Sequence, residues 1–206
     1  MERSGIWAIV GGVVIGLGAI AAVTTFTLGQ RATEIDCGGT AIGGSIGGPF
    51  TLVDDTGATV TDEDVITAPT VIYFGYTFCP DICPMDTQRN AFAIEELEDR
   101  GIIANALFIS IDPARDTPEV VGAFGHGFHE RMQGLTGSED QVSAAAQAYR
   151  VFYSKDDSGD SDFYLMNHST FSYFVTPESG FVDVFSRETT PEDMADRVAC
   201  YVEAGA

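Results

Sequence analysis

The chain has 206 residues, of which 31 are acidic and 10 basic, and its formal net charge is −21. Nucleic acid and anionic membrane surfaces repel a chain of this charge, which excludes both as electrostatic partners. The acidic, lysine-poor composition suits adaptation to salt or simple solubility, and by itself it identifies no partner.

An uncharged stretch of about 25 residues, from Gly5 to Gly29, lies near the beginning of the chain. A helix that spans a bilayer needs roughly 20 apolar residues, whereas the apolar part of a cleaved signal peptide has about 7–15. We therefore expect residues 1–30 to form a retained N-terminal membrane anchor helix. Residues 31–48, rich in glycine, are expected to form a tether. Residues 49–206 are long enough for one globular domain with a single core.

Strands and helices alternate in the predicted domain. Residues 70–74, Thr-Val-Ile-Tyr-Phe, form a continuous apolar, β-branched and aromatic run, as a fully buried central strand requires. Thr117 and Pro118 are typical of a helix N-cap followed by proline at the first helical position. The predicted elements are, in order, strand 50–53, strand 70–74, helix 85–100, strand 103–111, a helix from 117, strand 132–135, helix 139–149, strands 163–166, 169–176 and 181–185, and helix 190–202. This order predicts a thioredoxin-like α/β sandwich.

Two cysteines, Cys79 and Cys83, follow the predicted strand 70–74 and begin the next helix. Their spacing puts both sulfurs on one side of the first helical turn. Free N–H groups and a partial positive charge at a helix N-terminus stabilise a thiolate there. Two such thiols can form one disulfide or hold one soft metal ion, and Cu(I) is the ion that thiolates favour. Zinc is disfavoured because a structural zinc site needs four protein ligands.

His168 could supply a third ligand, since imidazole is a good donor to copper. A single histidine at a strand end is, however, often only a hydrogen-bonded surface residue, and the residues alone leave that alternative open. Two other histidines, His126 and His129, are three apart in a glycine-rich sequence. We interpret them as an exposed helix end rather than a second metal site.

The remaining cysteines, Cys37 and Cys200, lie at opposite ends of the predicted domain. Disulfides persist in oxidising compartments, and the two ends of a domain often lie close together. We therefore expect a structural disulfide between them, in a domain exported from the cytoplasm. Two unrelated thiols are the alternative.

Three stretches of the sequence match a known pattern in the same order. They are Tyr73-Phe74-Gly75-Tyr76-Thr77-Phe78-Cys79-Pro80-Asp81-Ile82-Cys83-Pro84, Ser110-Ile111-Asp112-Pro113-Ala114-Arg115-Asp116-Thr117-Pro118 and Asn167-His168-Ser169. Together they resemble the Sco/SenC family of membrane-anchored copper proteins, and the resemblance extends from about residue 49 to the C-terminus. The first two stretches are highly specific in combination, whereas His-Ser alone is not.

The resemblance implies a function. Cys79, Cys83 and His168 would bind one copper ion, Cu(I) or Cu(II). The protein would be a single-pass metallochaperone of the inner (cytoplasmic) membrane with its soluble domain in the periplasm. It would deliver copper to the binuclear copper site of cytochrome c oxidase subunit II, and a thiol reductant would keep its cysteines reduced.

Three residues of the second stretch, Asp112, Arg115 and Asp116, match a motif that we interpret as a charged loop supporting the site. One departure from the family is Asn167, where the family usually has Asp. It removes a local negative charge, which bears on copper affinity, but it removes no ligand.

Two other functions remain open. The pair Cys79 and Cys83 could act as a thiol–disulfide reductase on the oxidase cysteines, which needs no histidine. Three residues separate the two cysteines, which counts against a reductase, because thioredoxin-type enzymes usually have two residues between theirs. A redox or copper sensor that signals through a partner is the other alternative. No catalytic residue is assigned, since we expect a metal carrier rather than an enzyme.

Overall fold

The structure, a computed structural model, describes residues 37–39, 46–156 and 163–206. The described residues belong to one compact unit, Cys37–Ala206. Within these described ranges no helix is both long and apolar enough to cross a bilayer. The predicted anchor, residues 1–30, lies outside them.

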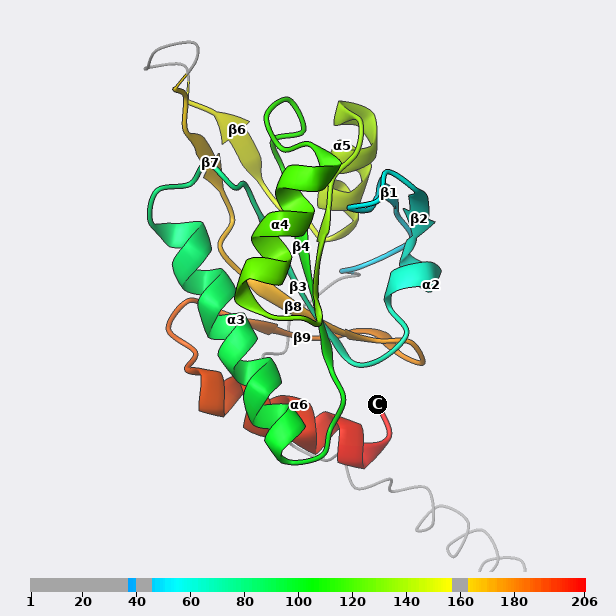
Figure 1. The fold of residues 1–206 in the computed structure, drawn as a ribbon. Helices are drawn as coiled ribbons and strands as arrows, with labels where there is room; N and C mark the ends of the chain where they lie inside the picture. Colours follow the sequence, from blue (N-terminus) through cyan, green and yellow to red (C-terminus); the bar gives the residue numbers. More distant parts are fainter. Residues whose placement is uncertain (1–36, 40–45, 157–162) are drawn as a thin grey trace, which may run out of the picture. The chain divides into compact units, whose positions relative to one another are not determined.

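A five-stranded mixed sheet forms the centre of this unit, in the order β5-β4-β3-β8-β9 (Figure 1). Its strands are β3 (Thr70–Gly75), β4 (Asn105–Ser110), β5 (Met132–Leu135), β8 (Ser172–Thr176) and β9 (Gly180–Phe185). The first three run parallel to one another, and β8 pairs antiparallel with both β3 and β9. All six residues of β3 are buried, as its continuous apolar run predicts.

Both faces of the sheet are covered. Helices α3 (Ile82–Asp99) and α6 (Pro191–Ala204) pack on one face, where Ile94 and Val198 meet Val71 of β3. The next residue of β3, Ile72, points to the opposite face and packs with Val142 of α5 (Glu139–Ala148). The hairpin of β1 (Thr51–Val53) and β2 (Thr59–Thr61), the short helix α2 (Asp62–Val65) and helix α4 (Pro118–Phe128) complete the unit. The architecture is the predicted thioredoxin-like α/β sandwich.

Two local predictions were wrong. Helix α3 begins at Ile82 rather than at residue 85, because Pro84 is tolerated in a first helical turn, so Cys83 is itself helical. The predicted strand 163–166 is instead β7 (Met166–His168), which pairs antiparallel with β6 (Tyr153–Lys155). These two short strands form through pairing with each other, and no local alternation of apolar and polar residues predicts that pairing.

Candidate metal and dithiol site

The two cysteines lie where β3 gives way to α3. Cys79 is partly exposed in the connecting loop, and Cys83 is fully buried in the first turn of the helix. The N-cap residue Asp81 makes no side-chain cap, so the first amides of α3 are available to other acceptors. The Cys83 amide donates to the Cys79 sulfur, with 3.3 Å between N and Sγ.

The two thiols differ sharply in acidity. A hydrogen bond from the Cys83 thiol lowers the pKa of Cys79 to about 5, and backbone amides and the Tyr76 hydroxyl assist. The pKa of Cys83 is raised, because its hydrogen bond to Cys79 favours the protonated form and burial disfavours charge. At neutral pH the pair therefore holds one accessible thiolate and one buried thiol.

His168, the last residue of β7, faces this pair. Its Nε2 lies 3.4 Å from the Cys83 sulfur, and its Nδ1 lies 2.8 Å from the Ser169 carbonyl oxygen. A carbonyl only accepts, so Nδ1 carries the proton and the Nε2 lone pair faces the Cys83 sulfur. The rings of Tyr73 and Tyr76 flank the imidazole nearly at right angles, with ring centres 6.1 Å and 6.0 Å away. Figure 1 shows the β6–β7 hairpin beside the beginning of α3.

The donor atoms of this arrangement fit a soft metal ion. Two sulfurs and an imidazole nitrogen are the donors that Cu(I) prefers. Contacts run from Cys79 to Cys83 and from Cys83 to His168, so Cys83 is the central member. In the described part of the chain, no three His, Cys, Asp or Glu side chains are already arranged as a metal site. A three-ligand site would therefore require Cys79, in the loop before α3, to bring its sulfur within bonding distance of the ion that Cys83 and His168 hold.

Arg115 links the two segments that carry these residues. Its guanidinium carbon lies 3.6 Å from the ring centre of Tyr164, before β7, and 4.7 Å from that of Phe78, next to Cys79. Its Nη1 donates to the Tyr164 carbonyl at 2.9 Å, and its Nε donates to Asp112 at 2.5 Å. The Tyr164 hydroxyl closes the ring of contacts by donating to Asp112 at 2.6 Å.

Asp116 supports the cysteine loop from below. Its carboxylate accepts from the Thr77 amide at 3.0 Å, the Thr77 hydroxyl at 2.6 Å and the Ser110 hydroxyl at 2.6 Å. Burial raises the pKa of Asp116, and the bonds from Ser110 and Thr77 oppose that shift. The three residues of the charged motif thus contact both sides of the site.

Sequence reasoning missed several residues of this site. The Tyr76 hydroxyl bonds to Cys79 and to the Met166 backbone, and burial raises its pKa to about 12. Buried Tyr73 donates to buried Asp86 at 3.0 Å beneath Cys83. Gly75 leaves room for the Cys83 sulfur, which would lie 3.1 Å from a Cβ at that position. Tyr73, Gly75 and Tyr76 belong to the first stretch that resembles the Sco/SenC family, but only the cysteines of that stretch had been assigned a role.

The other predicted residues lie elsewhere. His126 is exposed near Asp55, as expected, but the prediction of an exposed His129 was wrong. Its side chain is buried, with Nε2 3.5 Å from Glu98, because the end of α4 turns it toward α3. Asn167 is exposed in β7 and, because neighbouring residues of a strand point to opposite faces, it lies on the other face from His168.

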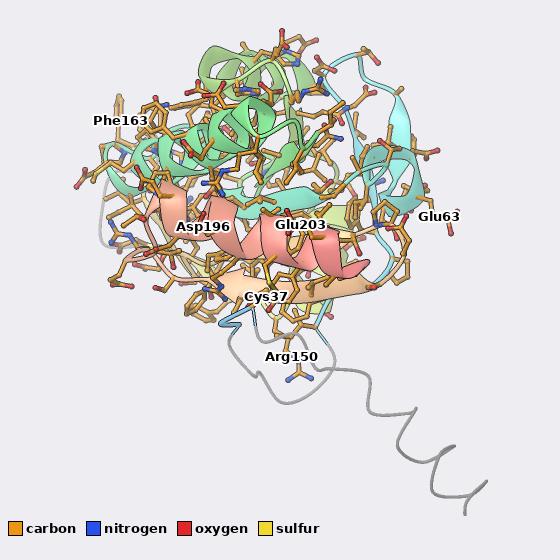
Figure 2. The ribbon with its side chains drawn as sticks, turned by 90° about the horizontal axis from the view of Figure 1, so that it is seen from below. Cys37, Glu63, Arg150, Phe163, Asp196 and Glu203 are labelled. Atoms are coloured by element: carbon orange, nitrogen blue, oxygen red, sulfur yellow. A yellow bond between two sulfur atoms is a disulfide. The ribbon has the colours of Figure 1, made fainter. Side chains whose placement is uncertain are left out.

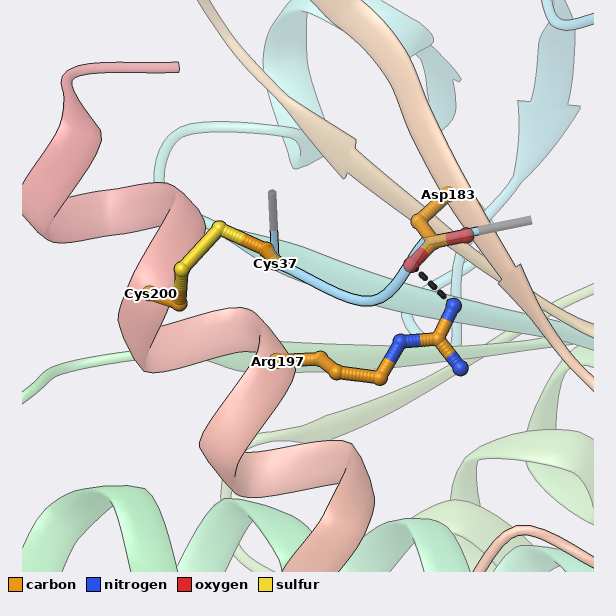
Figure 3. Close-up of a disulfide and its surroundings, with 4 residues drawn as sticks. All are labelled: Cys37, Asp183, Arg197 and Cys200. Atoms are coloured by element: carbon orange, nitrogen blue, oxygen red, sulfur yellow. Dashed lines mark hydrogen bonds and ion pairs between the residues drawn. A yellow bond between two sulfur atoms is a disulfide. The ribbon is translucent and has the colours of Figure 1, made fainter. Parts of the chain in front are cut away.

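Cys37 and Cys200 are joined by a disulfide, with 5.7 Å between their Cα atoms (Figure 3). Cys200 lies on α6, one turn after Arg197, which forms an ion pair with buried Asp183 of β9. The disulfide therefore attaches the first residue of the compact unit to its last helix.

The fold and site define a thioredoxin-like domain whose two thiols meet an imidazole from a distant hairpin. Residues 39–203 match the family model SCO1/SenC. Protein SenC of Rhodobacter capsulatus is 50% identical over 159 residues, which cover 77% of this chain and 72% of that protein. The mitochondrial SCO1 homolog 1 of Arabidopsis thaliana is 40% identical over 155 residues, 75% of this chain but 46% of that protein. The chain belongs to the SCO1/SenC family.

Solved structures agree with this assignment. Arabidopsis thaliana ScoI with copper bound matches with a TM-score of 0.72 and 38% identity, over 77% of this chain and 99% of that one. Yeast Sco1 with copper bound matches with a TM-score of 0.72 and 36% identity, over 78% of this chain and 90% of that one.

Proposed function

We propose that the protein is a copper carrier that binds one copper ion through Cys79, Cys83 and His168. The observation that carries this proposal is the 3.4 Å approach of His168 Nε2 to the Cys83 sulfur. One copper ion bound there would have the Cys83 sulfur and His168 Nε2 as donors, and both donor types suit copper. Two relatives whose structures match this chain are copper-bound.

The recipient we propose is the binuclear copper site of cytochrome c oxidase subunit II, as the family resemblance implies. Delivery requires that the ligands can be replaced one at a time. Cys79 is the more accessible of the two sulfurs, whereas Cys83 is buried. An incoming ligand of the acceptor would therefore displace Cys79 first, and the ion would leave Cys83 and His168 afterwards.

We place the protein at the cytoplasmic membrane, with residues 1–30 as a single-pass anchor, residues 31–48 as a tether and residues 49–206 as the copper-binding domain in the periplasm. The disulfide between Cys37 and Cys200 supports an oxidising location, because such bonds rarely persist in the cytoplasm. Cys79 and Cys83 must instead be reduced before they can bind copper, so a thiol reductant is a required partner.

Copper titration of single-ligand variants tests the binding proposal. The reduced wild-type protein should take up one copper ion per chain. Cys79→Ser, Cys83→Ser and His168→Ala should each weaken binding by about tenfold or more and change the absorption spectrum. His126→Ala is the matched control, since His126 is exposed near Asp55 and outside the site. Unchanged affinity and spectrum in His168→Ala would refute the three-ligand site.

A thiol–disulfide reductase is the second candidate, favoured by the unequal acidity of the two thiols. The Cys79 thiolate would attack a substrate disulfide, forming a mixed disulfide and releasing one substrate thiolate. Cys83 would then lose its proton and attack the Cys79 sulfur, releasing the second substrate thiolate and leaving a Cys79–Cys83 disulfide. A thiol reductant would restore the dithiol. Reduction that requires Cys79 but survives His168→Ala, in a protein without copper affinity, would favour this candidate.

A further inference from the structure

Large exposed apolar side chains gather at the ends of the segments that carry the proposed ligands. Phe78 precedes Cys79, Met85 follows Cys83 by two residues, and Leu165 precedes His168 by three. The nine large apolar side chains that are exposed in the described domain include these three together with Phe163 and Phe171. We call Phe78, Met85, Phe163, Leu165 and Phe171 the apolar rim.

Two members of the rim, Phe78 and Phe163, contact each other across separate segments. The rings of Phe78 and Phe163 are 6.2 Å apart, although one belongs to the cysteine loop and the other to the segment before β7. Arg115 packs over Phe78 and fixes its position. Figure 2 shows Phe163 at the outer edge of the domain, and its side chain is 67% exposed.

Exposed Phe and Met beside the partly exposed Arg115 match the composition of protein–protein contact cores, in which aromatic residues, Met and Arg are enriched. Exposing apolar side chains to water is unfavourable, and a large exposed apolar patch usually marks an interaction site. An acceptor that takes an ion from Cys79 must also contact the residues around it, because its own ligands have to reach bonding distance.

The charge of the domain narrows the choice of partner. The chain has 31 acidic and 10 basic residues. Most described arginines are already ion-paired with acids of the same domain, namely Arg89, Arg100, Arg115, Arg131, Arg187 and Arg197. The remaining acids therefore dominate the field, which attracts a basic partner and repels both a second copy of this chain and an anionic membrane.

We propose that the apolar rim docks a copper-accepting protein that has an apolar patch next to its own metal ligands and basic residues around that patch. This inference rests on the proposed carrier function and identifies the surface that the transfer uses. The apolar contact supplies affinity, and the opposite charges supply the encounter rate and orientation.

The test measures docking and copper transfer separately, using the reduced, copper-loaded protein and the soluble copper domain of cytochrome c oxidase subunit II from the same organism as the probe. Titration calorimetry gives the dissociation constant for wild type, for Phe163→Ser with Met85→Ser, and for Ile103→Ser. Ile103 is the matched control, because it is 59% exposed, as is Met85, but lies before β4 and outside the rim. The copper affinity of every variant is measured in parallel.

Docking through the rim predicts at least a tenfold rise in the dissociation constant for the double variant, no change for Ile103→Ser, and weaker wild-type binding at higher salt. If the double variant binds as tightly as wild type, or wild type does not bind at all, the docking proposal is overturned. Binding that salt leaves unchanged overturns the basic partner. Docking without copper transfer would refute the carrier function but support the docking surface. Copper transfer that is unchanged in the double variant would support the carrier function but refute the docking surface.

Discussion

The sulfur of Cys83 and Nε2 of His168 lie 3.4 Å apart although 85 residues separate them in the chain. Because the Ser169 carbonyl holds the proton on Nδ1, the Nε2 lone pair faces the Cys83 sulfur, while the thiol proton of Cys83 is donated to Cys79. Both groups are therefore preoriented toward one point. A metal ion that binds there must displace the thiol proton, so proton release accompanies binding.

The acidity of Cys79 gives a direct pH prediction. Its pKa is lowered from the ordinary 9.0 to about 5, chiefly by the hydrogen bond from Cys83. Only the thiolate reacts with iodoacetamide, so the rate should rise with pH through a midpoint near 5 and level off by about pH 7. Buried Cys83 should stay unmodified, which peptide mapping checks. Cys83→Ala removes the main cause and should move the midpoint upward, and a wild-type midpoint near 9 would contradict the assigned hydrogen bond.

Arg115 is expected to position His168 without contacting it. Arg115→Met should release the hairpin from the cysteine loop, weaken copper binding by about fivefold, and destabilise the fold by about 1–3 kcal/mol, because buried Asp112 loses its ion pair. Arg115→Lys should not restore binding, because an ammonium cannot replace the planar stacked fork.

Hydrogen exchange of residues 163–168 distinguishes positioning from general destabilisation. Exchange should accelerate in this segment first. Arg100→Met is the control, since it removes the ion pairs with Glu96 and Asp196 at the surface, which are worth only about 0–1 kcal/mol. An Arg115→Met protein with wild-type exchange and copper affinity would show that the stacked guanidinium does not orient the hairpin.

The fold could be predicted from the sequence because its determinants are local. The apolar run of β3 identified the central strand, and Thr117-Pro118 identified the beginning of α4. The spacing of Cys79 and Cys83 likewise identified a dithiol at a helix start. Each of these signals is contained within a few neighbouring residues.

The remainder of the site depends on long-range contacts. β6 and β7 are each three residues long and exist through their mutual pairing, so His168 could be assigned only by resemblance to a family. The stacking of Arg115 between Phe78 and Tyr164 joins three separate segments. No local pattern indicates such contacts, and the burial of His129 was mispredicted for the same reason.

Gly75 is expected to be required for the geometry of the site. A Cβ at this position would lie 3.1 Å from the Cys83 sulfur, 2.9 Å from Tyr73 and 3.0 Å from Phe108. Gly75→Ala should therefore displace the sulfur, cost about 1–3 kcal/mol of stability and weaken copper binding. Gly127→Ala in α4 is the control, because nothing lies within 4 Å of its added Cβ. Urea unfolding and copper titration of both variants decide the question, and equal behaviour of the two would show that the site adapts freely.

The disulfide between Cys37 and Cys200 should make a large contribution to stability. It closes a loop over a sequence separation of 163 residues, and the chain-entropy model gives about 5 kcal/mol for such a loop. Replacing both cysteines by serine should lower the free energy of unfolding by about this amount in urea titrations. The disulfide contains none of the proposed ligands, so copper affinity in the absence of urea should remain unchanged.

Reduction of the wild-type disulfide provides the independent control. The reduced protein should unfold at the same urea concentration as the double serine variant, because both remove the same constraint from the unfolded chain. Opening the bond should also free the segment at Gly39, whose added Cβ would meet the Tyr201 hydroxyl of α6 and which therefore packs closely there. An unchanged unfolding midpoint after reduction would contradict the predicted contribution of the disulfide. The stability would then come from the close packing of this segment on α6 and β9.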